Sequence, residues 1–336
     1  MFLSLALLAS AVTAPPLRAA DMSTDLSGAY ENARGALAAA SLPKDKNMPH
    51  PLLGRIWDAA AKKFIDEGEL MRRLGKARFI LLGEIHDNSD HHALQARIVR
   101  GLAAAGARCS VSFEMLPVDI GPRISARALG RPVSLQDLEG AWRDANEGDT
   151  YFSWSAYRPV VEAAVESGFG VLPANPAKAD TRLLHEKGWS ALNADFVARY
   201  LLDRPLPESV LAEKRREVVA GHCGYDPGEA YANAAINVQR ARDASMAESL
   251  ASSERGVLIA GVGHTRSDSG VPAYLALRFP EEKTISIAFT ELASGFEDPA
   301  TYVREPQDYV WFTLPWKRQD PCVEFRKQLE RMKKRS

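Results

Sequence analysis

Two short apolar stretches, far apart in the chain, each run directly into the pattern Gly-x-x-His. An apolar run of four or five residues that ends at glycine is typical of a buried strand, and a polar residue after it lies at the strand's carboxyl end. In open α/β sheets ligands bind at that edge, and imidazole is the commonest side-chain metal ligand. The two motif histidines, His86 and His264, therefore predict one site that is assembled by the fold.

Further strand patterns alternate with helix-like patterns along the chain. Strand patterns lie at 79–83, 110–114, 170–175, 257–261 and 286–290, and helix-like patterns at 53–74, 90–105, 157–167, 246–250 and 271–279. Strands that alternate with long helices predict crossover connections and a mainly parallel sheet. The expected fold class is α/β: a mainly parallel central sheet flanked by helices, with helical insertions at about 117–148 and 176–240 that cap the C-terminal ends of the strands.

Length and composition allow one large core or two modest ones, and we expect a single domain over residues 45–316. The chain has 336 residues, of which 46% are hydrophobic, so it can bury a large core, and disorder of the whole chain is excluded. Its 42 basic and 43 acidic residues nearly cancel, and no nucleic-acid-binding module is visible. We therefore expect no nucleic-acid partner.

The two ends of the chain differ from the rest. Residues 1–20 contain an apolar core that is too short to span a bilayer, which predicts a signal peptide and export to the periplasm or cell envelope. No cysteine lies near it, so a lipid anchor is not supported. Residues 317–336 carry eight basic and three acidic residues and are expected to form a basic helical tail.

Three cysteines allow at most one internal disulfide in an exported chain. Cys109 precedes a strand pattern and is expected to be a small core residue. Cys223 and Cys322 are able to pair, but the sequence alone does not show that they do.

Polar side chains follow four of the predicted strands. Two imidazoles with carboxylates suit Zn, Mn or Fe, and the candidate metal ligands are Glu84, His86, Glu114 and His264, with Asn175 at a fourth strand end. In a hydrolase, Glu84 or Glu114 would act as the base. One polar residue at a strand end is usually a helix cap or a solvated loop residue, but four together favour a shared site.

The residues that surround the two histidines have simpler alternatives. Asp90 is expected to cap the helix that follows His86. His91 and His92 point about 100° apart on that helix, so at most one of them can share the site, and for either one a solvated histidine is favoured. Arg266 either clamps an anionic ligand group or pairs with Asp268.

A set of motifs in a fixed order gives the chain a family resemblance. Leu-Leu-Gly-Glu-x-His-Asp-Asn is followed by His-His-x-x-Gln, Phe-Glu-Met, Trp-x-x-Tyr-Arg-Pro, His-Cys-Gly, Gln-x-x-Arg-Asp-Ala-x-Met-Ala and Gly-x-Gly-His-x-Arg-x-Asp-x-Gly-Val-Pro. This set, over about 53–292, resembles the ChaN-like haem-binding uptake family of the Tiki superfamily. The resemblance implies haem or iron uptake in a bacterial envelope and singles out Glu84, His86, Glu114 and His264. The chain lacks the lipobox cysteine of many such proteins, which suggests a soluble periplasmic form.

Two functions from different classes remain open. The first is haem binding in a flat apolar cleft with a His or Tyr ligand; the second is a metal-dependent hydrolase, a peptidase or esterase, as in the related Tiki and TraB proteins. The resemblance favours haem, and it implies outer-membrane uptake components and a homodimer as potential partners. The cleft candidates are Tyr157, Trp154, Asn175, Arg266, His91 and His92, and ordinary helix packing is the alternative for Tyr157 and Trp154. A structural protein with a vestigial site is the third possibility.

Overall fold

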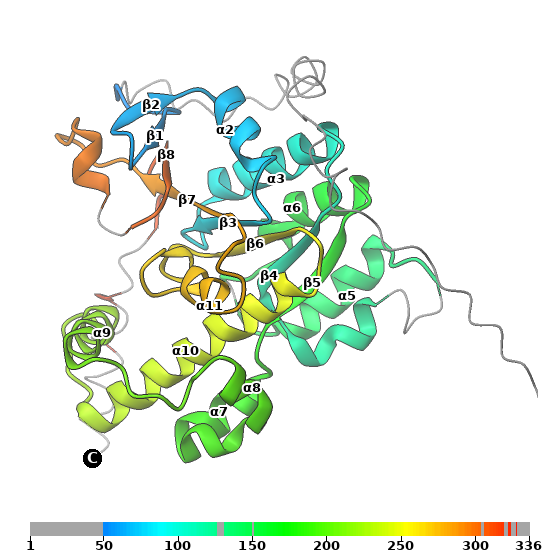
Figure 1. Ribbon diagram of the computed structural model, residues 1–336. Coiled ribbons are helices and arrows are strands. Elements are labelled where there is room, and N and C mark those ends of the chain that lie inside the picture. Colours follow the sequence, from blue (N-terminus) through cyan, green and yellow to red (C-terminus); the bar gives the residue numbers. More distant parts are fainter. Residues whose placement is uncertain are drawn as a thin grey trace, which may run out of the picture.

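The computed structural model describes residues 50–125, 131–149, 151–303, 306–318, 322–323 and 327, and an eight-stranded sheet lies at its centre (Figure 1). The strands are β1 (Ile56–Asp58), β2 (Lys63–Ile65), β3 (Phe79–Glu84), β4 (Ser110–Pro117), β5 (Gly170–Asn175), β6 (Gly256–Gly261), β7 (Thr284–Glu291) and β8 (Tyr309–Thr313). Their order is β2-β1-β8-β7-β3-β6-β4-β5. Strands β3 to β8 pair in parallel, whereas β1 is antiparallel to both of its neighbours. The predicted α/β fold class is confirmed.

Helices cover both faces of the sheet (Figure 1). One face carries α2 (Glu67–Leu74), α3 (Ser89–Ala104), α5 (Leu135–Ala145) and α6 (Trp154–Glu166). The other carries α10 (Glu229–Ala251) and α11 (Val271–Arg278), with α7 (Lys178–Lys187), α8 (Ala194–Arg199) and α9 (Glu208–Gly221) beside them. Short 3-10 turns are η2 (Val118–Ile124), η3 (Gly188–Ala191), η4 (Val262–Thr265) and η5 (Pro299–Tyr302).

The first four residues of strand β3, 79–82, are all apolar because helices cover the strand on both faces. Ile80 and Leu82 pack with the α3 and α6 side of the core, whereas Phe79 and Leu81 pack with the α10 and α11 side. Successive side chains of a strand point to opposite faces. The alternation therefore places Glu84, the last residue of β3, on the α3 and α6 side.

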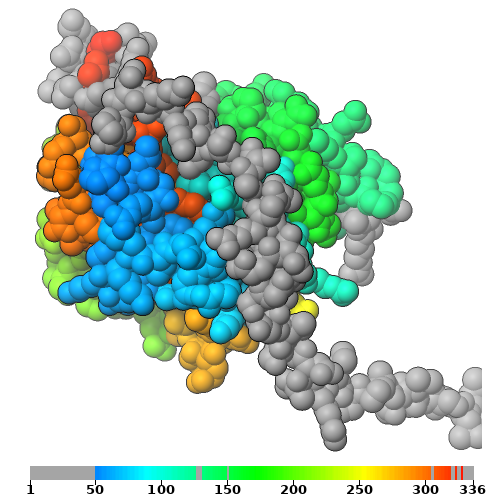
Figure 2. All heavy atoms as spheres, turned by 90° about the horizontal axis from the view of Figure 1, so that it is seen from above, coloured from blue at the N-terminus to red at the C-terminus, as the bar shows by residue number. Residues whose placement is uncertain are grey.

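The structure differs from the sequence prediction at one side of the sheet. The helix-like pattern at 53–74 forms the short strands β1 and β2 before helix α2 begins. The Trp57 and Phe64 rings pack 4.9 Å apart across this hairpin, and β1 also pairs with β8, so tertiary pairing overrides the local pattern. In Figure 2 this blue segment lies beside the orange segment of the later chain. The predicted closing strand at 286–290 is β7, and β8 follows it.

The predicted signal segment at 1–20 and most of the predicted tail at 317–336 lie outside the described residues. Within the part of the chain that the structure describes, no helix is both long and apolar enough to cross a membrane.

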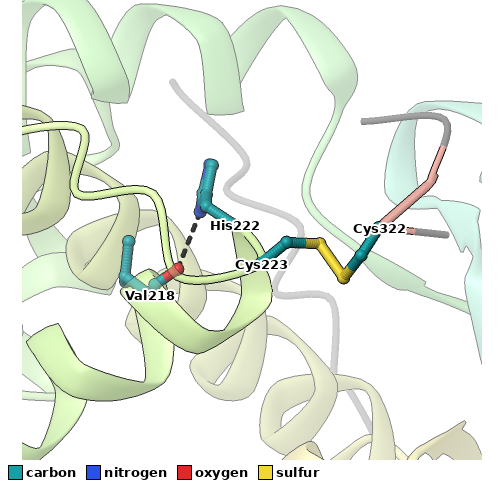
Figure 3. Close-up of a disulfide and its surroundings, with 4 residues drawn as sticks. All are labelled: Val218, His222, Cys223 and Cys322. Carbon is teal, nitrogen blue, oxygen red and sulfur yellow. Dashed lines mark hydrogen bonds between the residues drawn. A yellow bond between two sulfur atoms is a disulfide. The ribbon is translucent and has the colours of Figure 1, made fainter. Parts of the chain in front are cut away.

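A disulfide joins Cys223, just after α9, to Cys322 (Figure 3). The two cysteines are 99 residues apart in sequence, and their Cα atoms lie 5.5 Å apart. Next to Cys223, His222 donates from Nδ1 to the Val218 carbonyl at 2.7 Å (Figure 3). Cys109 is buried with a free thiol, as expected of a core residue.

We expect the disulfide to stabilise the fold, because it closes a long loop and so restricts the unfolded chain. Reduction of the wild-type protein should lower the free energy of unfolding by about 2–4 kcal/mol. Urea titrations with and without dithiothreitol measure this difference. The double variant Cys223→Ser/Cys322→Ser is the control: it should already be destabilised and should not respond to dithiothreitol.

Candidate functional site

The sheet order brings the predicted polar strand ends together. Strand β3 pairs with β6, with Glu84 opposite Gly261, and β6 pairs in turn with β4. Because these strands are parallel, their carboxyl ends meet at one edge of the sheet. His86 follows β3, His264 lies in η4 directly after β6, and Glu114 lies within β4. The edge therefore holds one cluster, as the sequence predicted.

Glu84 is a buried carboxylate, and it is 1% exposed. The Tyr157 hydroxyl donates to it, as do Gln95 Nε2 at 2.7 Å and His86 Nδ1 at 2.9 Å, and His92 Nε2 lies 3.4 Å away. Burial raises the pKa of Glu84, but His92 and His86 outweigh burial, so this pKa lies below its ordinary value. Glu84 is therefore ionised and fully surrounded by donors.

Glu114 lies between the two motif histidines and is also 1% exposed. Its Oε1 is 3.4 Å from His264 Nε2, and its Oε2 is 3.8 Å from His86 Nε2. The Gly261 amide donates to Oε2 at 2.7 Å, and Arg242 Nη2 lies 3.5 Å from Oε1. Burial raises the pKa of Glu114, but His264 and His86 lower it by more than burial raises it. The pKa therefore lies below its ordinary value, and this carboxylate is also ionised.

His264 has a carboxylate at each ring nitrogen. Its Nδ1 is 2.6 Å from Asp243 Oδ1 on α10, and its Nε2 faces Glu114. Burial lowers the pKa of His264, but Glu114 and Asp243 raise it to about 10. Burial raises the pKa of Asp243, and His264 only partly offsets this. The pair thus retains a proton at neutral pH.

His86 is the most accessible member of the cluster. Its side chain is 28% exposed, compared with 12% for His264 and 2% or less for the carboxylates of Glu84 and Glu114. The edge of its ring faces Phe152, with ring centroids 4.9 Å apart. Burial lowers the pKa of His86, but Glu84 and Glu114 raise it above the ordinary value. Any ligand that enters from solvent meets this imidazole first.

Glycines allow the two motifs to approach each other. A Cβ at Gly261 would lie 2.9 Å from His86 Nε2, and a Cβ at Gly83 would lie 2.3 Å from Thr265 Oγ1. No other residue type leaves this space, so the glycines of both motifs have a steric role in the cluster.

The helix after His86 differs from expectation in two ways. Asn88, not Asp90, caps α3: its side chain accepts from the Asp90 amide at 2.9 Å. His91 and His92 are buried rather than solvated, at 0% and 1% exposure. His92 packs on Tyr157 beside Glu84, whereas the ring nitrogens of His91 bond the Ile85 amide and the Thr313 hydroxyl. Only one of the two histidines shares the site, as the spacing predicted.

The aromatic cleft candidates do not line an open cleft. Tyr157 is 0% exposed and Trp154 is 5% exposed, and both pack on Trp142. Burial and the neighbouring Glu84 raise the pKa of Tyr157 well above its ordinary value, so its hydroxyl stays a donor. Trp154 is a packing residue of its helix, which was the alternative to a place in the cleft. Tyr157 packs in the same way, but its hydroxyl belongs to the cluster.

Two other candidates have positioning roles. Asn175 donates to the Glu114 carbonyl at 2.9 Å and accepts from Arg242 at 3.0 Å. Arg266 bonds both oxygens of Asp268 and also Glu217 on α9, so the pairing alternative describes this residue. Its guanidinium is therefore engaged within the fold.

Sequence reasoning quoted Gln95 and Asp243 within motifs but gave them no role. Gln95 lies three residues after His92, which places both on one face of α3 toward Glu84. Asp243 comes directly after Arg242, and both face Glu114 and His264. The available signal was helical spacing from a motif residue for Gln95, and an adjacent opposite charge pair, Arg242 and Asp243, within α10 for Asp243.

Segments distant in sequence fasten both motif loops. Arg318 bonds Asp87 and Glu291, and Glu291 accepts from Asn88 at 2.6 Å. On the other side, α9 reaches the second loop through Glu217, which accepts from Arg266 at 2.8 Å. The Cys223–Cys322 disulfide joins the end of α9 to the chain just after Arg318. The disulfide thus links α9, which contacts the second motif loop, to the segment near Arg318, which contacts the first.

Within the described ranges, no group of three or more His, Cys, Asp or Glu side chains is placed so that it could hold a metal ion. The four predicted ligands do lie together, but their oxygens and nitrogens face one another or internal donors. As placed, they form a hydrogen-bonded and charge-paired cluster.

The fold and the cluster together define a class of protein: a mainly parallel α/β sheet at whose edge two Gly-x-x-His loops meet. The sequence matches the family described as haem-binding uptake, Tiki superfamily, ChaN, over residues 70–275. The chain belongs to this family. No curated protein matches its sequence.

Solved structures resemble this fold. The structure that describes cofacial haem binding to ChaN of Campylobacter jejuni matches with a TM-score of 0.57 and 20% identity, over 76% of this chain and 95% of that chain. A mutant of the erythromycin esterase EreC in its open conformation matches with a TM-score of 0.40 and 15% identity, over 79% of this chain and 83% of that one. The Campylobacter structure shows that the ChaN fold is shared.

Tyr157→Phe should destabilise the protein because it removes one donor from the buried Glu84 carboxylate. The expected loss is about 1.5–3 kcal/mol of unfolding free energy, which is typical of a hydrogen bond to a charged group. Urea unfolding measures it, and Tyr151→Phe is the matched control because Tyr151 is 54% exposed. Equal stability of the two variants would contradict the role given to Tyr157.

Proposed function

We propose that this protein binds haem and acts in haem or iron uptake in a bacterial cell envelope. The observation that carries the proposal is the match of 70–275 to the haem-binding uptake family. The likeness to Campylobacter jejuni ChaN supports it through the shared fold.

His86 is the residue of the cluster that would bind haem iron. Haem iron in proteins takes a histidine or tyrosine ligand, and hydrogen bonds to that ligand tune its basicity. His86 has the right chemistry: Glu84 holds Nδ1 at 2.9 Å, and the ring is partly exposed. Phe152 supplies aromatic surface beside it. In this proposal the iron supplies the affinity for the ring nitrogen, and Glu84 fixes the imidazole orientation.

Haemin titration of the purified mature protein tests the proposal. The wild type should give a saturable Soret shift, and His86→Ala should weaken haemin binding on the order of tenfold or more because an axial ligand is lost. His185→Ala is the matched control, since this exposed histidine lies on α7 away from the cluster.

The possible outcomes separate the ligand from the function. If His86→Ala binds haemin like the wild type, His86 is not the ligand. If the wild type itself shows no saturable binding, haem binding by this chain is wrong.

Envelope location and an uptake role belong to the same proposal. The apolar segment at 1–20 has the character of an export signal, and the Cys223–Cys322 disulfide supports export because such bonds persist in oxidising compartments. Fractionation of the bacterium that makes the protein would place it in the periplasm if the proposal holds. Crosslinking there would then capture outer-membrane uptake components, and size-exclusion chromatography with and without haemin would detect a homodimer.

A second candidate function is hydrolysis, which the paired histidines favour. His86 and His264 each have a carboxylate partner and face Glu114 from two sides. In this reading His86 removes a proton from water that attacks an ester carbonyl, and protonated His264 gives a proton to the departing alkoxide. The raised pKa of His264, about 10, suits the acid role.

A pH profile of ester hydrolysis tests this second candidate. The rate should rise with pH as His86 loses its proton, at a pH above the ordinary histidine range because its pKa is raised, and fall near pH 10 as His264 loses its own. His264→Gln should lower the rate of ethyl butyrate hydrolysis, followed by pH-stat titration, about 100-fold or more and remove the alkaline limb, because the ethoxide leaving group needs the proton. Loss of activity on chelation, with recovery in Zn, Mn or Fe, would instead support the metal-dependent route. A wild-type rate equal to that of His264→Gln would rule out this function of the cluster.

A further inference from the structure

A separate cavity of about 470 Å³ lies at the β5 edge of the sheet, between β5, α8 and α10. Its walls are mainly apolar and include Leu172, Pro173, Leu192 and Phe196. None of the cluster's histidines or carboxylates lines it. Its volume lies within the range of about 300–1,000 Å³ that is typical of small-molecule sites.

In the cavity wall, the backbone at Pro173 has no unpaired hydrogen-bonding group. Strand β5 is an edge strand, and Pro173 has no amide hydrogen to leave unpaired there. The Pro173 carbonyl accepts from the Ser249 hydroxyl on α10 at 2.9 Å. This wall therefore offers a ligand an apolar surface rather than competing hydrogen-bonding groups.

Two polar side chains in the cavity have no partner among the described residues. Ser245 on α10 is 8% exposed and makes no side-chain hydrogen bond there, and the Asp180 carboxylate on α7 makes neither a hydrogen bond nor an ion pair. The other carboxylate in the lining, Glu248, is engaged by Arg199, Tyr200 and Arg278. Asp180, in the first turn of α7, is thus the carboxylate of this lining that no described side chain engages.

We infer that this cavity binds a small apolar molecule that carries a primary amine. The apolar body packs against Leu172, Leu192 and Phe196, and the ammonium group donates to Asp180. A carboxylate accepts a hydrogen bond more strongly from a cationic donor than from a neutral one, so a ligand with an ammonium group is favoured over one with a hydroxyl. Ser245 accepts or donates a further hydrogen bond deeper in the cavity.

A matched pair of probes tests this inference on the full mature chain by equilibrium dialysis at pH 7. 1-Naphthylmethylamine is cationic, and 1-naphthalenemethanol has the same rings without the charge. The amine should bind saturably, and the alcohol should bind on the order of tenfold more weakly. Asp180→Asn should remove this preference by weakening amine binding on the order of tenfold while leaving alcohol binding unchanged. Equal binding of the two probes, or an unchanged amine affinity in Asp180→Asn, would overturn the inference.

Leu192→Trp locates the binding, because a larger side chain there fills the cavity. Both probes should lose affinity in this variant, and unchanged affinity would place the probes elsewhere and overturn the inference. A thermal unfolding midpoint like that of the wild type confirms that the variant folds. If the variant does not fold, the Asp180→Asn comparison still decides, since Asp180 is partly exposed and packs no core.

Discussion

The buried carboxylate of Glu84 is the group on which the site and much of the packing depend. An ionised carboxylate inside a protein costs several kcal/mol unless donors surround it. Its donors come from different elements: Gln95 on α3, Tyr157 on α6, and His86 on the loop after β3, and the His92 ring on α3 lies 3.4 Å away. Helices α3 and α6 therefore have to dock in one register for the charge to be tolerated. The same contacts fix the ring of His86. The packing of α3 and α6 and the geometry of the site therefore depend on the same contacts of Glu84.

The alternation of side chains along parallel strands explains how one cluster spans both faces of the sheet. Glu84 faces α3 and α6, whereas Glu114 faces α10 through Arg242 and lies beside His264. At the edge where the strands end, His86 bridges the two carboxylates, and His264 joins Glu114 to Asp243. A continuous series of polar contacts thus runs from Tyr157 to Asp243 across the sheet. Only His86 of this series has substantial contact with solvent, which gives the cluster a single accessible end.

Local sequence was enough to predict the strands β3 to β7, their polar ends and the fold class, because each rests on a run of neighbouring residues. It could not predict that β3 pairs with β6, since that contact joins residues far apart in the chain. Tertiary contacts also explain the predictions that were wrong. β1 and β2 replaced a predicted helix because β8 supplies a partner, and His91 and His92 are buried because β8 and α6 cover them. The Cys223–Cys322 pairing stayed open for the same reason: spacing does not reveal which loops meet.

The close approach of Gly83 to Thr265 links the two motifs at a single point of contact. A methyl group at position 83 would occupy the place of the Thr265 hydroxyl, so residue 83 cannot become larger while threonine keeps its position. Relatives of this chain should therefore vary at these two positions together: where the first motif begins with alanine, the residue after the second histidine should be smaller than threonine. In an alignment, this steric dependence would appear as covariation between positions that no local pattern connects.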